Sequence, residues 1–216
     1  MTLITAHSGS DGTQENSLAF VRFFQHKPIE AIEIDVRYDQ ESKQLVLRHD
    51  EENIEEKTPL RAVFELMQET DLLVNCDLKE PGLEMRVKKL ADQYQLWERI
   101  LLSGTVDVYF LSRWPAHILM NIENGLEQSL SWEHWTEQTV LEAANYLIAR
   151  GATRLNLPYQ CYTERLATLA RKHNVALSLW TVNSLQDLSY FEEHNVYNLT
   201  TRNAWKYFQV RQEVVQ

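Results

Sequence analysis

The sequence predicts an α/β protein in which eight strand–helix units close into a (β/α)8 barrel, the TIM-barrel fold. Short apolar runs alternate with helical patterns of about ten residues, which is typical of a parallel sheet with crossover helices. About eight such units follow one another, which is enough to close a barrel. The alternative, a doubly wound open sheet, would need a glycine-rich turn after the first strand. No G-x-G-x-x-G is present in the sequence.

The first half of the chain contains well-marked elements. Leu60, Val63, Phe64 and Met67 share one helical face, and Lys27-Pro28 ends the helix that precedes the second strand. Glycines and polar residues at 8–14 predict a loop, and the acidic stretch 51–56 predicts a solvated loop. The expected strands are residues 3–7, 31–37, 44–48 and 72–79, and the expected helices are 18–24 and 60–67.

The second half repeats the same rhythm. We expect strands at residues 100–103, 117–122, 154–157, 175–181 and 197–200, and helices at 83–94, 106–112, 140–150, 164–173, 185–194 and the C-terminus. The stretch 123–136 is hard to assign, because polar residues interrupt it around Trp132 and Trp135. The sequence has no internal repeat or low-complexity linker, so we expect one domain over residues 1–216.

Composition limits the partners and the compartment. A hydrophobic content of 44% suits a protein with a sizeable core. A formal net charge of -10 argues against a nucleic-acid partner and against docking on anionic lipid through a basic patch. No apolar run reaches the length of a membrane span, and no signal-peptide pattern is visible, so we expect a cytoplasmic protein. Cys76 and Cys161 have no metal or disulfide spacing and are expected to be free thiols.

Two carboxylates share one face of the second expected strand. Glu33 and Asp35 point the same way, roughly 7 Å apart along the chain, whereas Ile32, Ile34 and Val36 point the other way. Exposure on a half-solvated strand would explain one acid. Two acids on an otherwise apolar strand are costly to bury unless a positive charge lies between them. A hard divalent cation prefers carboxylate oxygen, so the pair indicates a metal site.

Polar residues end most of the expected strands, and in such barrels the site lies at these ends. They are His7 on the first strand, Glu33 and Asp35 on the second, Asp77 and Lys79 on the third, Ser103 on the fourth, Asn156 on the sixth and Trp180 on the seventh. Taken singly, several have ordinary structural explanations: His7 as a buried histidine, Lys79 as a surface lysine and Trp180 as core. Their convergence on one mouth indicates a functional site, with Glu123 as a further candidate.

Several short segments also form an ordered set. They are Ile4-Thr5-Ala6-His7-Ser8-Gly9, Glu15-Asn16-Ser17-Leu18-Ala19-Phe20, Glu33-Ile34-Asp35-Val36, His49-Asp50, Asp77-Leu78-Lys79 and Trp180-Thr181-Val182-Asn183. In order and spacing this set resembles the motifs of glycerophosphodiester phosphodiesterases, over nearly the whole chain. The resemblance implies a barrel of the phospholipase C-like phosphodiesterase type, a hydrolase of lipid and glycerol metabolism.

The resemblance also implies a role for each site residue. Glu33, Asp35 and Asp77 would hold one divalent cation, Mg²⁺ or Ca²⁺. His7 and His49 would be the general acid and base, in an order that the sequence leaves open. Lys79 would neutralise phosphate charge and Trp180 would line the pocket for the alcohol. The partner would be a small phosphodiester, and the oligomeric state stays open.

The chain departs from the family pattern at the phosphate. The family's first motif reads His-Arg-Gly, and here Ser8 replaces the arginine, so one neutral donor replaces a bidentate clamp. We expect Ser8 to contact substrate and Arg37 or Arg48 to replace the lost guanidinium. Other departures are Gln14 for proline, Asp77 for glutamate, the missing aspartate and proline after the last strand, and a short segment after His49-Asp50.

Three functions remain in competition. The first is metal-dependent hydrolysis of glycerophosphodiesters, or related small diesters, to an alcohol and glycerol 3-phosphate. The second, favoured by Ser8, is a catalytically weak or inactive relative that binds a phosphodiester or phosphate. The retained histidines and acids argue against it, since binding alone needs no acid/base pair. The third, a metal-independent phospholipase-like barrel, would leave the three acids without an ion.

Overall fold

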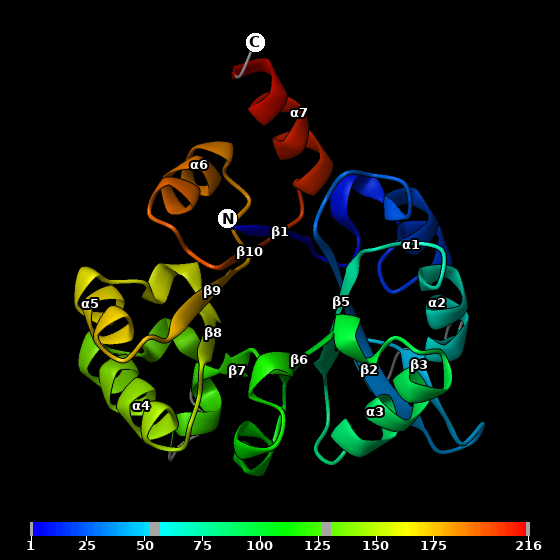
Figure 1. Cartoon of the computed structure of the whole chain (residues 1–216), viewed down its shortest axis with the longest axis horizontal. Coiled ribbons are helices and arrows are strands. Elements are labelled where there is room, and N and C mark those ends of the chain that lie inside the picture. Colours follow the sequence, from blue (N-terminus) through cyan, green and yellow to red (C-terminus); the bar gives the residue numbers. More distant parts are fainter. Residues whose placement is uncertain (1, 52–56, 127–130, 215–216) are drawn as a thin grey trace.

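The computed structural model describes residues 2–51, 57–126 and 131–214, and its parallel strands follow one another around a ring (Figure 1). In this part of the chain the ring consists of β1 (Leu3–Ala6), β2 (Ala31–Asp39), β5 (Leu73–Leu78), β6 (Ile100–Gly104), β7 (Met120–Asn121), β8 (Arg154–Pro158), β9 (Ala176–Trp180) and β10 (Asn198–Thr201). β1 pairs with both β2 and β10. Between β6 and β7 the link is one bridge, Leu102–Ile118, beside which the Leu119 N–H donates to the Leu102 carbonyl at 2.9 Å. The predicted α/β barrel is confirmed.

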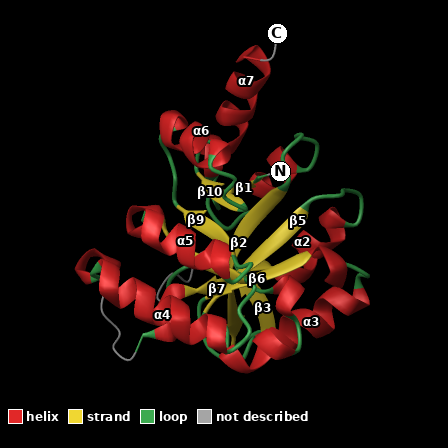
Figure 2. Cartoon of the chain, turned by 60° about the vertical axis from the view of Figure 1, so that its left-hand side comes forward, coloured by secondary structure: helices red, strands yellow, loops and turns green. Residues whose placement is uncertain are grey.

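Helices surround the strands (Figure 2). They are α1 (Leu18–Phe24), α2 (Leu60–Met67), α3 (Glu84–Gln93), α4 (Glu137–Ala149), α5 (Glu164–Lys172), α6 (Leu185–Glu193) and α7 (Ala204–Val214). Side-chain caps start several of them; for example, the Phe20 N–H donates to Ser17 Oγ at the start of α1. Among the described residues, no helix is long and apolar enough to cross a bilayer.

The connection between β6 and β7 differs from the prediction. The helix expected at 106–112 is a 3₁₀ helix, Val108–Ser112, and a second 3₁₀ turn, Pro115–His117, follows it. Pro115 lacks an N–H and restricts the residue before it, so an α-helix cannot continue through this segment. The strand expected at 117–122 shortens to Met120–Asn121. Most of the acidic loop expected at 51–56, and residues 127–130 of the stretch that was hard to assign, lie outside the described residues.

β2 is longer than its neighbours and carries a small antiparallel extension. β3 (Gln44–Leu47) pairs back along β2 from Asp39 to Val36, and β4 (Thr58–Pro59), which the sequence did not predict, pairs with β3. The chain therefore returns toward the middle of β2, where the Arg48 N–H donates to the Asp35 carbonyl at 3.1 Å. This return brings His49 beside the acidic strand.

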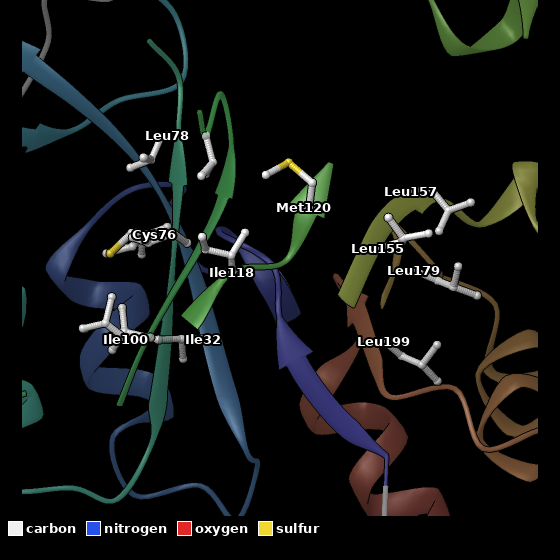
Figure 3. Packing of buried hydrophobic residues seen from close by; sticks show 14 of the residues in the cluster. Ile32, Cys76, Leu78, Ile100, Ile118, Met120, Leu155, Leu157, Leu179 and Leu199 are labelled. Carbon is white, nitrogen blue, oxygen red and sulfur yellow. The ribbon is translucent and has the colours of Figure 1, made fainter. Parts of the chain in front are cut away.

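The two faces of the strands differ in chemistry. Buried apolar side chains such as Ile32, Cys76, Leu155 and Leu199 lie on the strands of the ring (Figure 3). Along the strands they alternate with polar ones. They belong to the core that includes the inner faces of the helices. The alternating polar positions are also buried, and they are Thr5, Glu33, Asp35, Asn75, Ser103, Asn121, Asn156, Ser178, Asn198 and Thr200. The interior of the barrel is thus largely polar, and it opens onto the candidate site.

Candidate active site

One cavity of about 340 Å³ gathers most of the residues predicted at the mouth of the barrel. Its lining includes the predicted site residues His7, Glu33, His49, Asp77, Lys79 and Trp180, with Asn75, Ser103, Gly104, Asn121, Glu123 and Asn156. This volume lies in the range of small-molecule sites. Strands that are far apart in the sequence therefore contribute to one polar pocket.

Three carboxylates in this region form a candidate metal site. Oxygen atoms of Glu33, Asp35 and Asp77 all lie within 4.8 Å of one another. Two oxygens on opposite sides of one Ca²⁺ are separated by about 4.8 Å, twice the usual Ca²⁺–oxygen distance, so a single ion can contact all three. The predicted acids are therefore brought together in a geometry that suits one divalent cation.

The electrostatics of Glu33 also fit a cation. Burial raises the pKa of Glu33 from 4.5 to about 7; the imidazole of His7 opposes the rise, and the carboxylates of Asp35 and Asp77 add to it. The backbone N–H of Ser8 donates to Glu33 Oε2 at 3.2 Å. These contacts leave the carboxylate short of positive charge, which a hard divalent cation would supply.

Asp35 and Asp77 share a cation already present in the chain. Lys79 Nζ lies 2.9 Å from Asp35 Oδ1 and 2.5 Å from Asp77 Oδ2. Burial acts to raise the pKa of Asp35, but the Lys79 ammonium and the Asn16 side-chain amide outweigh it and lower this pKa. The same carboxylates raise the pKa of Lys79 above its usual range, against the effect of its burial. Lys79 is therefore a permanent cation in the site.

The pKa of Glu33 leads to a prediction for the metal-free protein. Between pH 4.5 and about 7 the folded state keeps a proton that the unfolded state releases, so the free energy of unfolding falls as pH rises through this window. Glu33→Gln should remove this fall and raise the free energy of unfolding at pH 8 by about 3 kcal/mol. Urea denaturation of both proteins at pH 5 and pH 8, in chelator, measures it. Identical pH dependence in the two proteins would contradict the assigned electrostatics.

The two histidines have the same ring nitrogen engaged. His7 Nδ1 lies 2.9 Å from the Ser8 carbonyl, and His49 Nδ1 lies 2.7 Å from Asp50 Oδ1. A carbonyl or carboxylate oxygen only accepts, so each Nδ1 carries the proton and each neutral ring keeps its lone pair on Nε2. His7 also lies 3.8 Å from Glu33 Oε2, whereas the His49 side chain is 58% exposed. Both rings can take up or release a proton at Nε2.

The phosphate contacts expected of Ser8 and Arg37 find other partners. Ser8 Oγ accepts the Asn16 N–H at 2.6 Å, and the Ser8 side chain is outside the cavity lining. Arg37 Nε donates to the His49 carbonyl at 2.9 Å, and its guanidinium lies 3.6 Å from Glu80. Arg37 thus holds the backbone of His49, and Arg48 Nε is buried without a partner. Neither arginine lines the cavity.

Some contributors to the site were not assigned a role in the sequence analysis. Asn16 makes two hydrogen bonds with Asp35: its Nδ2 donates to Asp35 Oδ2 at 2.7 Å, and its Oδ1 accepts the Asp35 N–H at 3.0 Å. Across the barrel, Thr5, Asn198, Ser178, Asn156 and Asn121 form a chain of side-chain hydrogen bonds. The alternation of these polar residues with apolar ones along the strands was the feature of the sequence that could have identified this series of hydrogen bonds.

The absence of a side chain at Gly104 leaves room for Asp77, the third acid of the cluster. The φ of Gly104 is +76°, and a Cβ there would overlap Asp77 Oδ1 and the Leu78 carbonyl. Gly104→Ala should therefore lower the free energy of unfolding by more than about 2 kcal/mol and disturb Asp77. Gly82→Ala is the matched control, because Gly82 has φ +82° but no neighbour within 4 Å. Equal losses in chemical denaturation of the two variants would contradict the steric argument.

Comparisons with known proteins identify the fold. No protein-family model and no curated protein sequence matches the chain. Solved structures do match, and the class of fold that they define is an α/β barrel. The neighbours over the whole chain are glycerophosphodiester phosphodiesterases, at low sequence identity. At this identity the likeness establishes the shared fold.

Three of these structures illustrate the match. A candidate glycerophosphoryl diester phosphodiesterase from Agrobacterium tumefaciens has TM-score 0.82 and 13% identity, covering 99% of this chain and 98% of that one. A glycerophosphodiester phosphodiesterase from Parabacteroides distasonis has TM-score 0.74 and 15% identity, with 100% and 98% covered. An Oleispira antarctica phosphodiesterase in complex with its product sn-glycerol-3-phosphate has TM-score 0.71 and 16% identity, with 98% and 97% covered.

Proposed function

We propose that the chain, as one catalytic domain, is a metal-dependent phosphoric diester hydrolase acting on glycerophosphodiesters or related small diesters. The products would be an alcohol and glycerol 3-phosphate. One observation carries the proposal: three acids lie within 4.8 Å of one another, and two of them, Glu33 and Asp77, line the same cavity as two histidines with Nε2 lone pairs. The shared fold with phosphodiesterase structures supports it.

The residues divide the chemistry between them. Glu33, Asp35 and Asp77 would hold a divalent cation, which would polarise a phosphoryl oxygen and orient the ester. One of His7 and His49 takes the proton of the attacking hydroxyl or water at Nε2, and the other protonates the leaving alcohol. Lys79 adds positive charge where the phosphoryl group becomes more negative. Trp180 forms part of the wall for the alcohol.

The direct test is release of glycerol 3-phosphate from sn-glycero-3-phosphocholine, with added Mg²⁺ or Ca²⁺ and with chelator. We expect metal-dependent release that chelator abolishes. Turnover that resists chelator would remove the metal from the mechanism. Absence of turnover with every added metal would contradict the hydrolase.

A second function has one observation in its favour. Neither Ser8 nor Arg37 lines the cavity, and both side chains have partners elsewhere: Ser8 Oγ accepts the Asn16 N–H, and Arg37 contacts the His49 carbonyl and Glu80. A weak or inactive relative would bind a phosphodiester through Lys79 and a metal without turning it over. In that case sn-glycero-3-phosphocholine would raise the melting temperature of the metal-loaded protein and remain intact.

A further inference from the structure

Two side chains of the cavity have hydrogen-bonding atoms without partners. Across residues 2–51, 57–126 and 131–214, the buried side-chain atoms in this condition are Arg48 Nε, Asn75 Oδ1 and Trp180 Nε1. Buried polar atoms are almost always paired, so each exception asks for an explanation. Two of the three belong to residues that line the same cavity. Two residues that line the cavity therefore carry one unused acceptor and one unused donor, both of them buried atoms.

The orientation of the Asn75 amide follows from its neighbours. Ser103 Oγ lies 3.0 Å from Asp77 Oδ1 and 3.0 Å from Asn75 Nδ2. The single hydroxyl proton of Ser103 goes to the Asp77 carboxylate, which can only accept, so toward Asn75 the hydroxyl oxygen is an acceptor. Asn75 must then turn its NH₂ group to Ser103 and its carbonyl oxygen away. Any group that satisfies Asn75 Oδ1 has to be a donor.

A second asparagine that lines the cavity, Asn156, has partners for both ends of its side-chain amide, unlike Asn75. Asn156 is similarly buried, at 6% exposure against 3% for Asn75. Its Oδ1 accepts from Ser178 Oγ at 2.7 Å, and its Nδ2 donates to Asn121 Oδ1 at 2.7 Å. Both ends of that amide are used by the protein. A polar barrel interior alone therefore does not account for the free oxygen of Asn75.

The position of Asn75 on β5 places this residue next to the acidic cluster. Asn75 is the register partner of Glu33, and Asp77 is the partner of Asp35, on two adjacent parallel strands. Asn75 and Asp77 point to the same side of β5. A donor bound to Asn75 therefore lies beside the carboxylates that would hold the metal and the phosphate.

We propose that Asn75 is a specificity-determining residue that accepts a hydrogen bond from a free hydroxyl group on the substrate, while the Trp180 indole N–H donates to a substrate oxygen. The phosphodiester part of this inference rests on the proposed function. A site built to pair a substrate hydroxyl strongly rejects the analogue that lacks it, because the buried protein atom is then left unpaired. The cavity selects phosphodiesters of hydroxylated alcohols over those of plain alkyl alcohols.

The kinetic test compares two substrates of the metal-loaded protein: sn-glycero-3-phosphocholine and propyl phosphocholine, which lacks both hydroxyl groups. The wild type should prefer the first by about 100-fold or more in kcat/KM. Asn75→Leu, similar in shape but without the acceptor, should reduce this ratio to within a few-fold. The matched control, Asn156→Leu, should keep the wild-type ratio even if its stability falls. A ratio near one in the wild type, or an unchanged ratio in Asn75→Leu, would overturn the proposal.

A binding test separates this inference from the proposed function. Glycerol 3-phosphate should raise the melting temperature of the metal-loaded wild type more than propyl phosphate does, and Asn75→Ala should lose the difference. This result without any diester hydrolysis would reject the hydrolase and retain the role of Asn75. Equal shifts from the two phosphates in the wild type would overturn the role of Asn75, with or without turnover. If the variants do not fold, equal shifts from the two phosphates in the wild type still overturn the proposal.

Discussion

Replacing either His7 or His49 by alanine is expected to lower kcat for sn-glycero-3-phosphocholine by about a hundredfold or more. Both rings line the cavity, and each is held at Nδ1 by an acceptor, so Nε2 is the nitrogen left for the proposed proton transfer. Loss of the ring removes the proton acceptor or donor while the three acids stay in place. Steady-state kinetics with saturating metal measure the effect on kcat separately from metal binding.

His194 provides the control for these two variants. It is exposed at the end of α6, and its Nδ1 lies 2.7 Å from the Tyr190 carbonyl, outside the cavity. His194→Ala should leave kcat unchanged. A change of less than a few-fold in His7→Ala or His49→Ala would remove that residue from the proposed proton transfer. Unchanged metal-induced stabilisation in both variants would show that they still assemble the acidic site.

The barrel could be predicted because the strands follow a simple pattern. Short apolar strands alternate with helical segments, and helices such as Leu60–Met67 carry their apolar residues on one face. Glu33 and Asp35 could be assigned to one face by the two-residue period of a strand, and the structure places them together with Asp77. Predictions that depend on local periodicity are therefore confirmed for the fold and the acidic cluster.

Other predictions depended on the conformation of loops. Ser8 and Arg37 were expected at the phosphate, but their partners come from Asn16, Glu80 and the backbone of His49. These contacts depend on how the loops at 8–16 and 48–50 fold back, which side-chain spacing does not determine. The segment 106–112 was predicted as a helix, but the structure has a 3₁₀ helix at Val108–Ser112, and Pro115 prevents an α-helix from continuing beyond it.

Removing the metal site should have the second large effect. Asp35→Asn removes one charged ligand from a cluster whose oxygens lie within 4.8 Å, so it should weaken divalent cation binding by at least tenfold and lower kcat/KM to a similar extent. Metal at about 100 times its Kd should stabilise the wild type by about 2.7 kcal/mol, and tenfold weaker binding should reduce this stabilisation in Asp35→Asn to about 1.4 kcal/mol or less at the same concentration. Isothermal titration calorimetry with Mg²⁺ and Ca²⁺ measures the affinities.

Asp39 is the control for that variant. It lies on β2 as well and is buried, but its carboxylate pairs with Lys57 at 2.9 Å and accepts the Ser42 N–H at 2.8 Å. Asp39→Asn should therefore lower the free energy of unfolding without changing metal affinity. Equal losses of metal affinity in Asp35→Asn and Asp39→Asn would indicate a general structural effect and contradict the metal site.

Replacing Lys79 tests whether the acidic cluster binds a metal ion or needs only the positive charge of this lysine. Its ammonium contacts Asp35 and Asp77, two of the three acids that would hold the ion, so protein cation and metal compete for the same carboxylates. Lys79→Met should raise the affinity for Mg²⁺ or Ca²⁺, since one positive charge leaves the cluster. The same variant should lower kcat by about a hundredfold, because the charge that faces the phosphoryl group is gone. Metal affinity and kcat change in opposite directions only if Lys79 competes with the metal in the resting protein and assists it in the reaction. Weaker metal binding in Lys79→Met would contradict this role.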